Sequence, residues 1–157
     1  MTVVSDTSPL CYLLLIEAID ILPALYAHVV IPTRVRAELA SPQAPAAVQT
    51  WINKPPDWLT VQTIDAEFDS AAENIDQEEY EAIMLALSID ADLILLDDLA
   101  GRRAARERGL EAIGLIGVLQ LAAKRGLVDI TVAIEKLRLT NFRISERLLE
   151  RLLKDAM

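Results

Sequence analysis

The chain has 157 residues, of which 53% are apolar, 24 are acidic and 15 are basic, giving a formal net charge of −9. This length and apolar content predict a single folded domain over residues 1–157 and exclude a disordered chain. The acidic balance argues against a protein that grips nucleic acid through a broad basic surface. Most of the acids are expected to be solvated surface charges, but any that converge on one site need a cation.

The sequence gives no sign of export or of a membrane segment. Its longest unbroken apolar run, residues 10–16, is far shorter than the roughly 20 residues that cross a bilayer. The N-terminus lacks the basic segment and the small-residue cleavage site of a signal peptide. The single cysteine, Cys11, cannot form an internal disulfide and is expected to be a small core residue. These features predict a cytoplasmic protein.

Short apolar segments alternate with helical patterns along the chain. The expected strands cover residues 2–4, 28–31, 58–61, 93–96 and 111–113. The expected helices cover residues 10–15, 18–26, 33–40, 76–89 and 99–108, followed by helices with breaks near Gly126 and Thr140. The proline-rich residues 41–57 are expected to form a surface excursion. Wholly apolar strands alternating with helices predict an α/β fold, with three α/β/α layers and a central, mostly parallel sheet.

Two of the expected strands end in acids. Asp6 follows the first strand, and the pair Asp97 and Asp98 follows the fourth. In an open parallel sheet, ligands bind beyond the carboxyl ends of the strands, so these acids are expected to face one crevice. The alternative is that Asp6 and Asp98 only cap the helices that follow them.

Two further acids fall on helices. Glu38 lies at the margin of the apolar stripe of its helix, and the alternative role for it is a surface ion pair with Arg34, four residues earlier. Glu79 shares a helix face with Ile83, whereas Glu78 and Glu81 are expected to point elsewhere. Asp76 followed by Glu79 also resembles a capping box, so Glu79 could be a cap, a metal ligand or both.

Four carboxylates brought close together repel one another, and burial adds to the cost, so such a cluster needs a cation. All-oxygen ligation favours Mg²⁺ or Mn²⁺ over zinc. A divalent ion can supply a bound water as nucleophile and polarise a phosphate.

The residues around these acids resemble the PIN-domain nucleases, and more closely the branch related to VapC-type toxins of toxin–antitoxin pairs. The similarity runs through residues 3–10, 31–39, 79–86, 95–105 and 114–127, in the order of that branch. One departure is that the branch commonly has glycine where this chain has Glu78.

The resemblance implies a divalent-metal endoribonuclease with an α/β/α fold, usually dimeric and often silenced by a small antitoxin. Carried over by position, the catalytic and metal-binding acids are Asp6, Glu38, Glu79 and Asp98, with Asp97 as a neighbour or replacement. Thr7 or Ser8 would hydrogen-bond the first acid or a water of the metal.

Other residues carry two interpretations. Arg102, Arg103 and Arg106 either form a solvated helix face or guide an RNA backbone to the site. The amphipathic segment 142–157 is expected to pack on its own domain, with a dimer or antitoxin contact as the alternative. His28 has no second histidine or cysteine with which to share a metal and is expected to be structural.

Three functional hypotheses follow. The first is a Mg²⁺- or Mn²⁺-dependent ribonuclease built on the four acids. The second is a catalytically silent PIN-like module that binds RNA or a protein partner. The third is a receiver-like signalling domain, which leaves Glu38 and Glu79 without a role.

Overall fold

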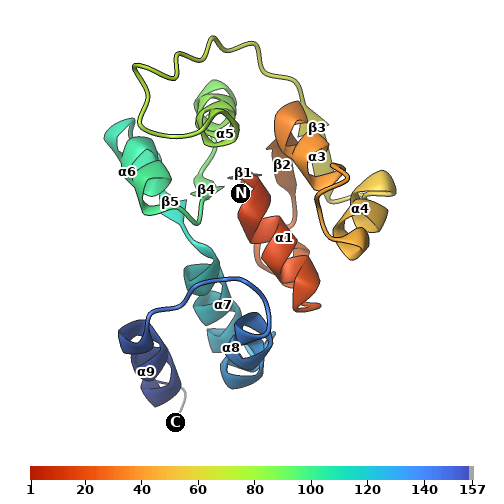
Figure 1. Ribbon diagram of the computed structural model, residues 1–157, viewed down its shortest axis with the longest axis vertical. Helices are drawn as coiled ribbons and strands as arrows, with labels where there is room; N and C mark the ends of the chain where they lie inside the picture. Colours follow the sequence, from red (N-terminus) through yellow and green to blue (C-terminus); the bar gives the residue numbers. More distant parts are fainter. Residues whose placement is uncertain (156–157) are drawn as a thin grey trace.

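The computed structural model describes residues 1–155, and within them it has five strands and nine helices (Figure 1). The strands are β1 (Val3–Ser5), β2 (Val29–Pro32), β3 (Leu59–Gln62), β4 (Leu93–Leu95) and β5 (Ala112–Ile113). The helices are α1 (Thr7–Leu15), α2 (Ile21–Tyr26), α3 (Thr33–Leu39), α4 (Ala46–Asn53), α5 (Gln77–Ser88), α6 (Leu99–Glu107), α7 (Leu115–Lys124), α8 (Ile130–Arg138) and α9 (Glu146–Asp155).

The strands form one parallel sheet in the order β3-β2-β1-β4-β5. β1 is central, and Val4 pairs with Val30 on one side and Ile94 on the other. Because β1 and β4 are parallel neighbours, the residues that follow them emerge side by side at one edge of the sheet. The acids Asp6 and Asp97 occupy these positions, as the sequence predicts.

Helices cover both faces of the sheet. Successive strand residues point to opposite faces, so Val3 packs into one apolar cluster with α1 and α7, whereas Val4 packs into a second cluster with α5. The second cluster is completed by α6 through Ala105. These two clusters establish the predicted three-layer α/β/α arrangement.

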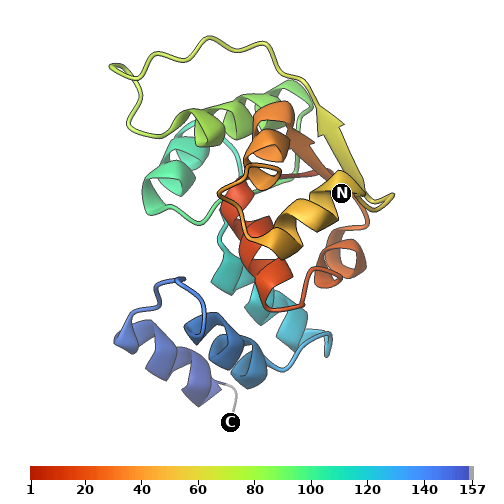
Figure 2. The ribbon, with the colours of Figure 1, turned by 45° about the vertical axis from the view of Figure 1, so that its right-hand side comes forward.

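The last three helices gather at one end of the molecule, away from α5 and α6 (Figures 1 and 2). In α9, Leu149 and Leu152 are buried in the same apolar cluster as α7 and α8. The amphipathic segment therefore packs on its own domain, and the last two residues of the predicted range, 156–157, lie outside the described residues. None of the helices described between residues 1 and 155 has the length and apolar content needed to span a bilayer.

The proline-rich segment 41–57 differs from the prediction. It contains the two-turn helix α4, which buries Val48 and Ile52 against the main core. The helix begins directly after Pro45 and ends before Pro55, so proline bounds it without interrupting it. The expectation of a surface excursion was wrong because the density of proline hid a short apolar stripe of period four.

Candidate active site

Asp6 lies at the carboxyl end of the central strand and is buried, with 8% of its surface exposed. Its backbone N–H donates to the carbonyl of Leu95 at 3.0 Å, which extends the β1–β4 pairing as far as the acid. The side chain makes no capping hydrogen bond to α1, and its Oδ1 atom is buried without a partner in the described structure. The interpretation of Asp6 as only a helix cap is therefore wrong.

The two acids after β4 have different roles. Asp98 is exposed, and its carboxylate accepts from the Gly101 N–H at 3.3 Å, so it caps α6 as the alternative interpretation predicted. Asp97 accepts from the N–H of Leu115 at 2.7 Å through Oδ1, while its Oδ2 is buried without a partner among the described residues. Of the pair, Asp97 is the one whose charge acts on Asp6.

Glu79 forms the capping box that its spacing from Asp76 indicated, and its role as a metal ligand stays a prediction. Its N–H donates to Asp76 Oδ1 at 2.8 Å, and its own Oε1 accepts from the Asp76 N–H at 3.3 Å, which completes a capping box. Its Oε2 is buried and has no partner within residues 1–155. This atom lies against Gly101 of α6, where any Cβ would collide with it. A glycine at this position is what lets the carboxylate fit between α5 and α6.

Glu38 does not pair with Arg34 as the alternative interpretation proposed. Arg34 forms an ion pair with Glu81 of α5, which ties α3 to α5. The Glu38 carboxylate instead lies near Glu78, and burial followed by the charge of Glu78 raises the pKa of Glu38. The expectation that Glu78 points away from the site was wrong, because the first turn of α5 lies directly beside α3.

Burial without a compensating positive charge raises the pKa values of the acids at this edge. It raises the pKa of Asp6 to about 7, opposed by the Thr7 backbone amide and reinforced by the charges of Asp76, Glu38 and Asp97. Burial also raises the pKa of Glu79 to about 8 and that of Asp97 to about 6, where the Leu115 amide opposes it. These acids are thus costly to ionise together as the chain stands.

Asp76 is a site residue that the sequence analysis treated only as a cap. Its charge raises the pKa of Asp6, of Glu38 and of Glu79, so it lies in the same acidic group as all three. The signal for it was its position three residues before Glu79, since a capping box brings the two carboxylates to one helix end.

The residues at this edge fit a divalent cation by their chemistry. Asp6 Oδ1, Glu79 Oε2 and Asp97 Oδ2 are buried carboxylate oxygens without partners in the described part of the chain, and such atoms are rare in folded proteins. All are hard oxygen donors of the kind that Mg²⁺ and Mn²⁺ prefer. Within residues 1–155, however, no three Asp, Glu, His or Cys side chains are already arranged around one ion position.

The predicted substrate-binding residues divide into two groups. Arg102 donates to the carbonyls of Leu96 and Asp97, and Arg106 donates to the carbonyl of Ala112 at 3.0 Å, so both hold the backbone at the ends of β4 and β5. Arg103 is exposed.

Thr7 and Ser8 are both half-buried in the first turn of α1, directly after Asp6. The Thr7 Oγ1 atom is buried and has no partner in the described residues. The Thr7 side chain also lies close to Glu38, whose raised pKa it opposes, and its bonding to a ligand or a water stays a prediction. His28 hydrogen-bonds Thr60 at 2.6 Å, away from the acids.

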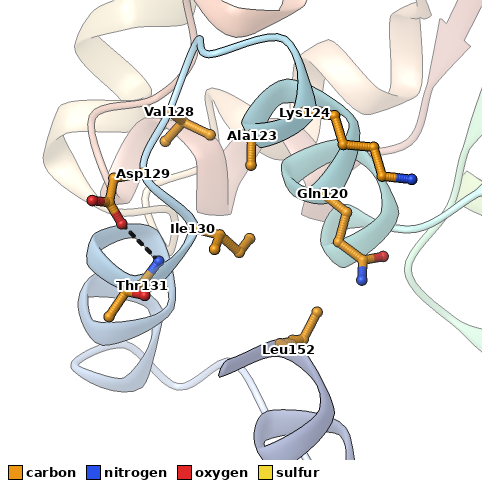
Figure 3. A pocket seen from close by; sticks show the side chains of 8 residues that line it. All are labelled: Gln120, Ala123, Lys124, Val128, Asp129, Ile130, Thr131 and Leu152. Atoms are coloured by element: carbon orange, nitrogen blue, oxygen red, sulfur yellow. Dashed lines mark hydrogen bonds between the residues drawn. The ribbon is translucent and has the colours of Figure 1, made fainter. Parts of the chain in front are cut away.

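A cavity of about 460 Å³ opens beside the acids, lined by Thr7, Cys11, Glu38 and Glu78 together with residues of the segment that leads into α4. A second cavity, of about 560 Å³, lies among the C-terminal helices between Lys124, Ile130 and Leu152 (Figure 3). The second cavity touches none of the acids described above, so the first is the one next to the candidate chemistry.

The chain belongs to the PIN-domain family, whose model matches residues 2–157. A solved structure with the same fold is that of a PilT N-terminus domain protein, SSO1118, from the hyperthermophilic archaeon Sulfolobus solfataricus P2. It has 23% sequence identity and a TM-score of 0.57, and the match covers 78% of this chain and 93% of that one. No curated protein matches the chain.

Proposed function

We propose that this protein is a divalent-metal-dependent endoribonuclease whose site is formed by Asp6, Glu38, Glu79 and Asp97. Membership of the PIN-domain family supports a nuclease-type fold, and PIN domains are generally nucleases that use divalent metals. The observation that carries the proposal is the set of three unpartnered, buried carboxylate oxygens, which belong to Asp6 after β1, Asp97 after β4 and Glu79 of α5. Asp97 is placed ahead of Asp98 because the Asp98 carboxylate caps α6, although the charge of Asp98 also raises the pKa of Glu79.

The carboxylates at this edge would hold Mg²⁺ or Mn²⁺, with Asp6 and Glu79 as the buried ligands and Asp97 and Glu38 beside them. When bound, such an ion supplies positive charge to a phosphate and lowers the pKa of a coordinated water. Asp6 and Glu79 are both buried, so little bulk water reaches their carboxylates. Thr7 Oγ1 would orient a water or a phosphate oxygen beside Asp6, since Thr7 directly follows that acid and its side chain also acts on Glu38.

The capping box gives Glu79 a second role in this chemistry. The Asp76 N–H holds Glu79 Oε1, so the side chain is fixed while Oε2 stays available. In the same way, the Leu115 N–H donates to Oδ1 of Asp97 and leaves Oδ2 available. Side chains oriented by a second partner in this way are pre-organised for a ligand.

The proposal has four finer parts: an RNA substrate, a role as the toxin of a toxin–antitoxin pair, a small antitoxin partner and a homodimeric state. The resemblance of residues 3–10 and 79–86 to the VapC-type branch supports them. A specific observation favours the silent binding module as the second candidate: Glu78 adds a charge beside Glu38, and no ion position is pre-formed within residues 1–155.

The test is cleavage of single-stranded RNA with Mg²⁺ or Mn²⁺ by wild type, by Asp6→Asn and by the matched control Asp57→Asn, which changes an exposed acid outside the site. We expect Asp6→Asn to lower the rate by at least about 100-fold and Asp57→Asn to leave it unchanged. Equal rates for wild type and Asp6→Asn would remove Asp6 from the mechanism. RNA binding by wild type without metal-dependent turnover would instead establish the silent module.

A further inference from the structure

The positive charge of the chain is concentrated in its C-terminal helices. Residues 115–157 carry eight Lys or Arg and five Asp or Glu, whereas residues 1–114 carry seven basic and 19 acidic residues. A polyanion is therefore repelled by residues 1–114 and attracted by the C-terminal helices α7, α8 and α9.

The arginines of α6 do not fill this role by themselves. Arg102 and Arg106 hold backbone carbonyls, and Arg103 is exposed. All three belong to residues 1–114, which carry an excess of acids. A strand of RNA that reaches the acidic site needs a further cationic surface, because its phosphates are repelled there wherever no metal compensates the carboxylates.

A cavity of about 400 Å³ lies where α8 ends and α9 begins. It is lined by two exposed arginines, Arg138 and Arg143, and by the half-buried ring of Phe142, together with Ile144, Glu146 and Leu149. Its volume is in the range of sites for small ligands, which runs from about 300 to 1,000 Å³. Arginines beside an aromatic ring are the combination that proteins use for single-stranded nucleic acid, since the ring stacks on a base and the guanidinium groups hold phosphates.

This cavity is joined to the helix that follows Asp6. The Tyr12 hydroxyl of α1 donates to Asn141 Oδ1 at 2.7 Å. The rings of Tyr12 and Phe142 pack edge to face with their centroids 4.9 Å apart. Burial, the neighbouring Cys11 and the charge of Asp97 raise the pKa of Tyr12, so this tyrosine also lies within the field of the acidic group. The segment that lines the cavity is thus packed on α1, the helix that directly follows Asp6.

We propose that the cavity between α8 and α9 is a subsite that binds one nucleotide of single-stranded RNA, with Arg138 and Arg143 at its phosphates and Phe142 stacked on its base. Glu146 can accept hydrogen bonds from the amino groups of that base. The inference rests on the proposed function in taking RNA as the substrate, and it adds the surface that holds the strand while the acids act on it.

The test measures binding of a fluorescent 12-nucleotide single-stranded RNA by anisotropy, with Mg²⁺ present and with Asp6→Asn in every protein to prevent turnover. Arg143→Ala should raise the Kd about tenfold, and Phe142→Leu, which keeps an apolar side chain against Tyr12, about fivefold. The matched control Arg151→Ala removes the same charge from an exposed position of α9 outside the cavity and should change the Kd less than twofold. Arg143→Ala should also reduce the slope of log Kd against log salt by about one.

If Arg143→Ala and Arg151→Ala raise the Kd for RNA equally, the RNA is attracted only by the general positive charge of the C-terminal helices. That result would overturn the subsite. Unchanged RNA affinity together with lost binding of polyglutamate would assign the cavity to an acidic protein partner and would also overturn it. Cross-linking of RNA that contains 4-thiouridine to the peptide around Phe142 would support the subsite directly. Failure of wild type to cleave RNA would contradict the proposed function alone, because these binding measurements do not depend on turnover.

Discussion

Charged side chains are buried at the acidic edge of the sheet, whereas those of the C-terminal helices are exposed or hydrogen-bonded. At the edge, Asp6 and Glu79 are buried, and each has an oxygen without a partner in the described structure. Among the C-terminal helices, Asp129 is satisfied by the N–H groups of Thr131 and Val132, and the arginines are exposed. The C-terminal helices follow the ordinary rules for charge in a folded protein, and the edge departs from them.

That difference indicates where function lies. A buried carboxylate without a partner costs free energy, and folded proteins keep such groups where a ligand compensates them. Such groups follow β1 and β4 and lie on α5, far apart in the sequence, and the charge of Asp97 acts on Asp6 while that of Asp6 acts on Glu79. The chain belongs to the PIN-domain family, which suggests a nuclease-type fold.

The largest change in cleavage rate is expected from Gly101→Ala, which tests whether the buried acidic edge is the site. The new Cβ would displace the Glu79 carboxylate, and a displacement of about 1 Å at a catalytic group costs roughly 100-fold in rate. Because alanine favours the helix more than glycine does, α6 should stay folded, which circular dichroism would verify. Adding Glu79→Asp, which shortens the acid, should restore part of the metal-dependent cleavage. Wild-type cleavage by Gly101→Ala alone would show that the position of the Glu79 carboxylate is unimportant.

The next effect concerns stability and pH. The raised pKa values of Asp97, Asp6 and Glu79, about 6, 7 and 8, mean that the folded protein binds these protons more tightly than the unfolded chain does. Their stabilisation is therefore complete at low pH and is lost as the pH rises through that range. In EDTA, the melting temperature should fall by about 5 °C between about pH 5 and pH 8.5.

Adding Mn²⁺ to the same thermal unfolding measurements provides a control. Mn²⁺ stabilises the ionised carboxylates, so it should raise the melting temperature at about pH 8.5 and have little effect at about pH 5. Asp6→Asn should flatten the dependence on pH. A melting temperature that rises with pH in EDTA would contradict the description of these acids as buried and uncompensated.

The smallest effect is that of Glu78→Gln. Removing the charge beside Glu38 should lower the pKa of Glu38, so the acid limb of the pH–rate profile should move to lower pH. Cleavage at about pH 6 should then rise two- to threefold. The exposed Glu67, changed to Gln, serves as the control. An unmoved acid limb would mean that Glu38 does not titrate in the rate-determining step.

The sequence predicted the sheet well because its signals are local. Each strand is a short apolar run followed by a helix, and such runs specify a parallel sheet without knowledge of distant contacts. Gly109, with φ of +86°, ends α6 as expected of a glycine at that position. The helix α4 was missed because two prolines before it and two after it are the usual signal for a loop.

The site was predicted only in part, because the roles of acids depend on neighbours that the sequence does not reveal. Asp97 and Asp98 are adjacent in sequence, and only the packing of α7 against the end of β4 determines which one is held by Leu115. Similarly, Arg34 could reach Glu38 on its own helix, but α5 presents Glu81 to it instead. Capping, in contrast, is local, and the capping box of Asp76 and Glu79 was visible from spacing alone.

Whether the buried acids bind a divalent ion can be measured by calorimetric titration of the metal-free protein with Mn²⁺ at about pH 7, repeated in buffers of different ionisation enthalpy. Because Asp6 and Glu79 hold protons near this pH, binding of the ion should release them, and the measured heat should change with the buffer. Asp6→Asn should lose both the binding and this buffer dependence, while Asp57→Asn should keep them. Binding of equal strength in wild type and Asp6→Asn, or no binding by wild type, would contradict a metal site at the end of β1.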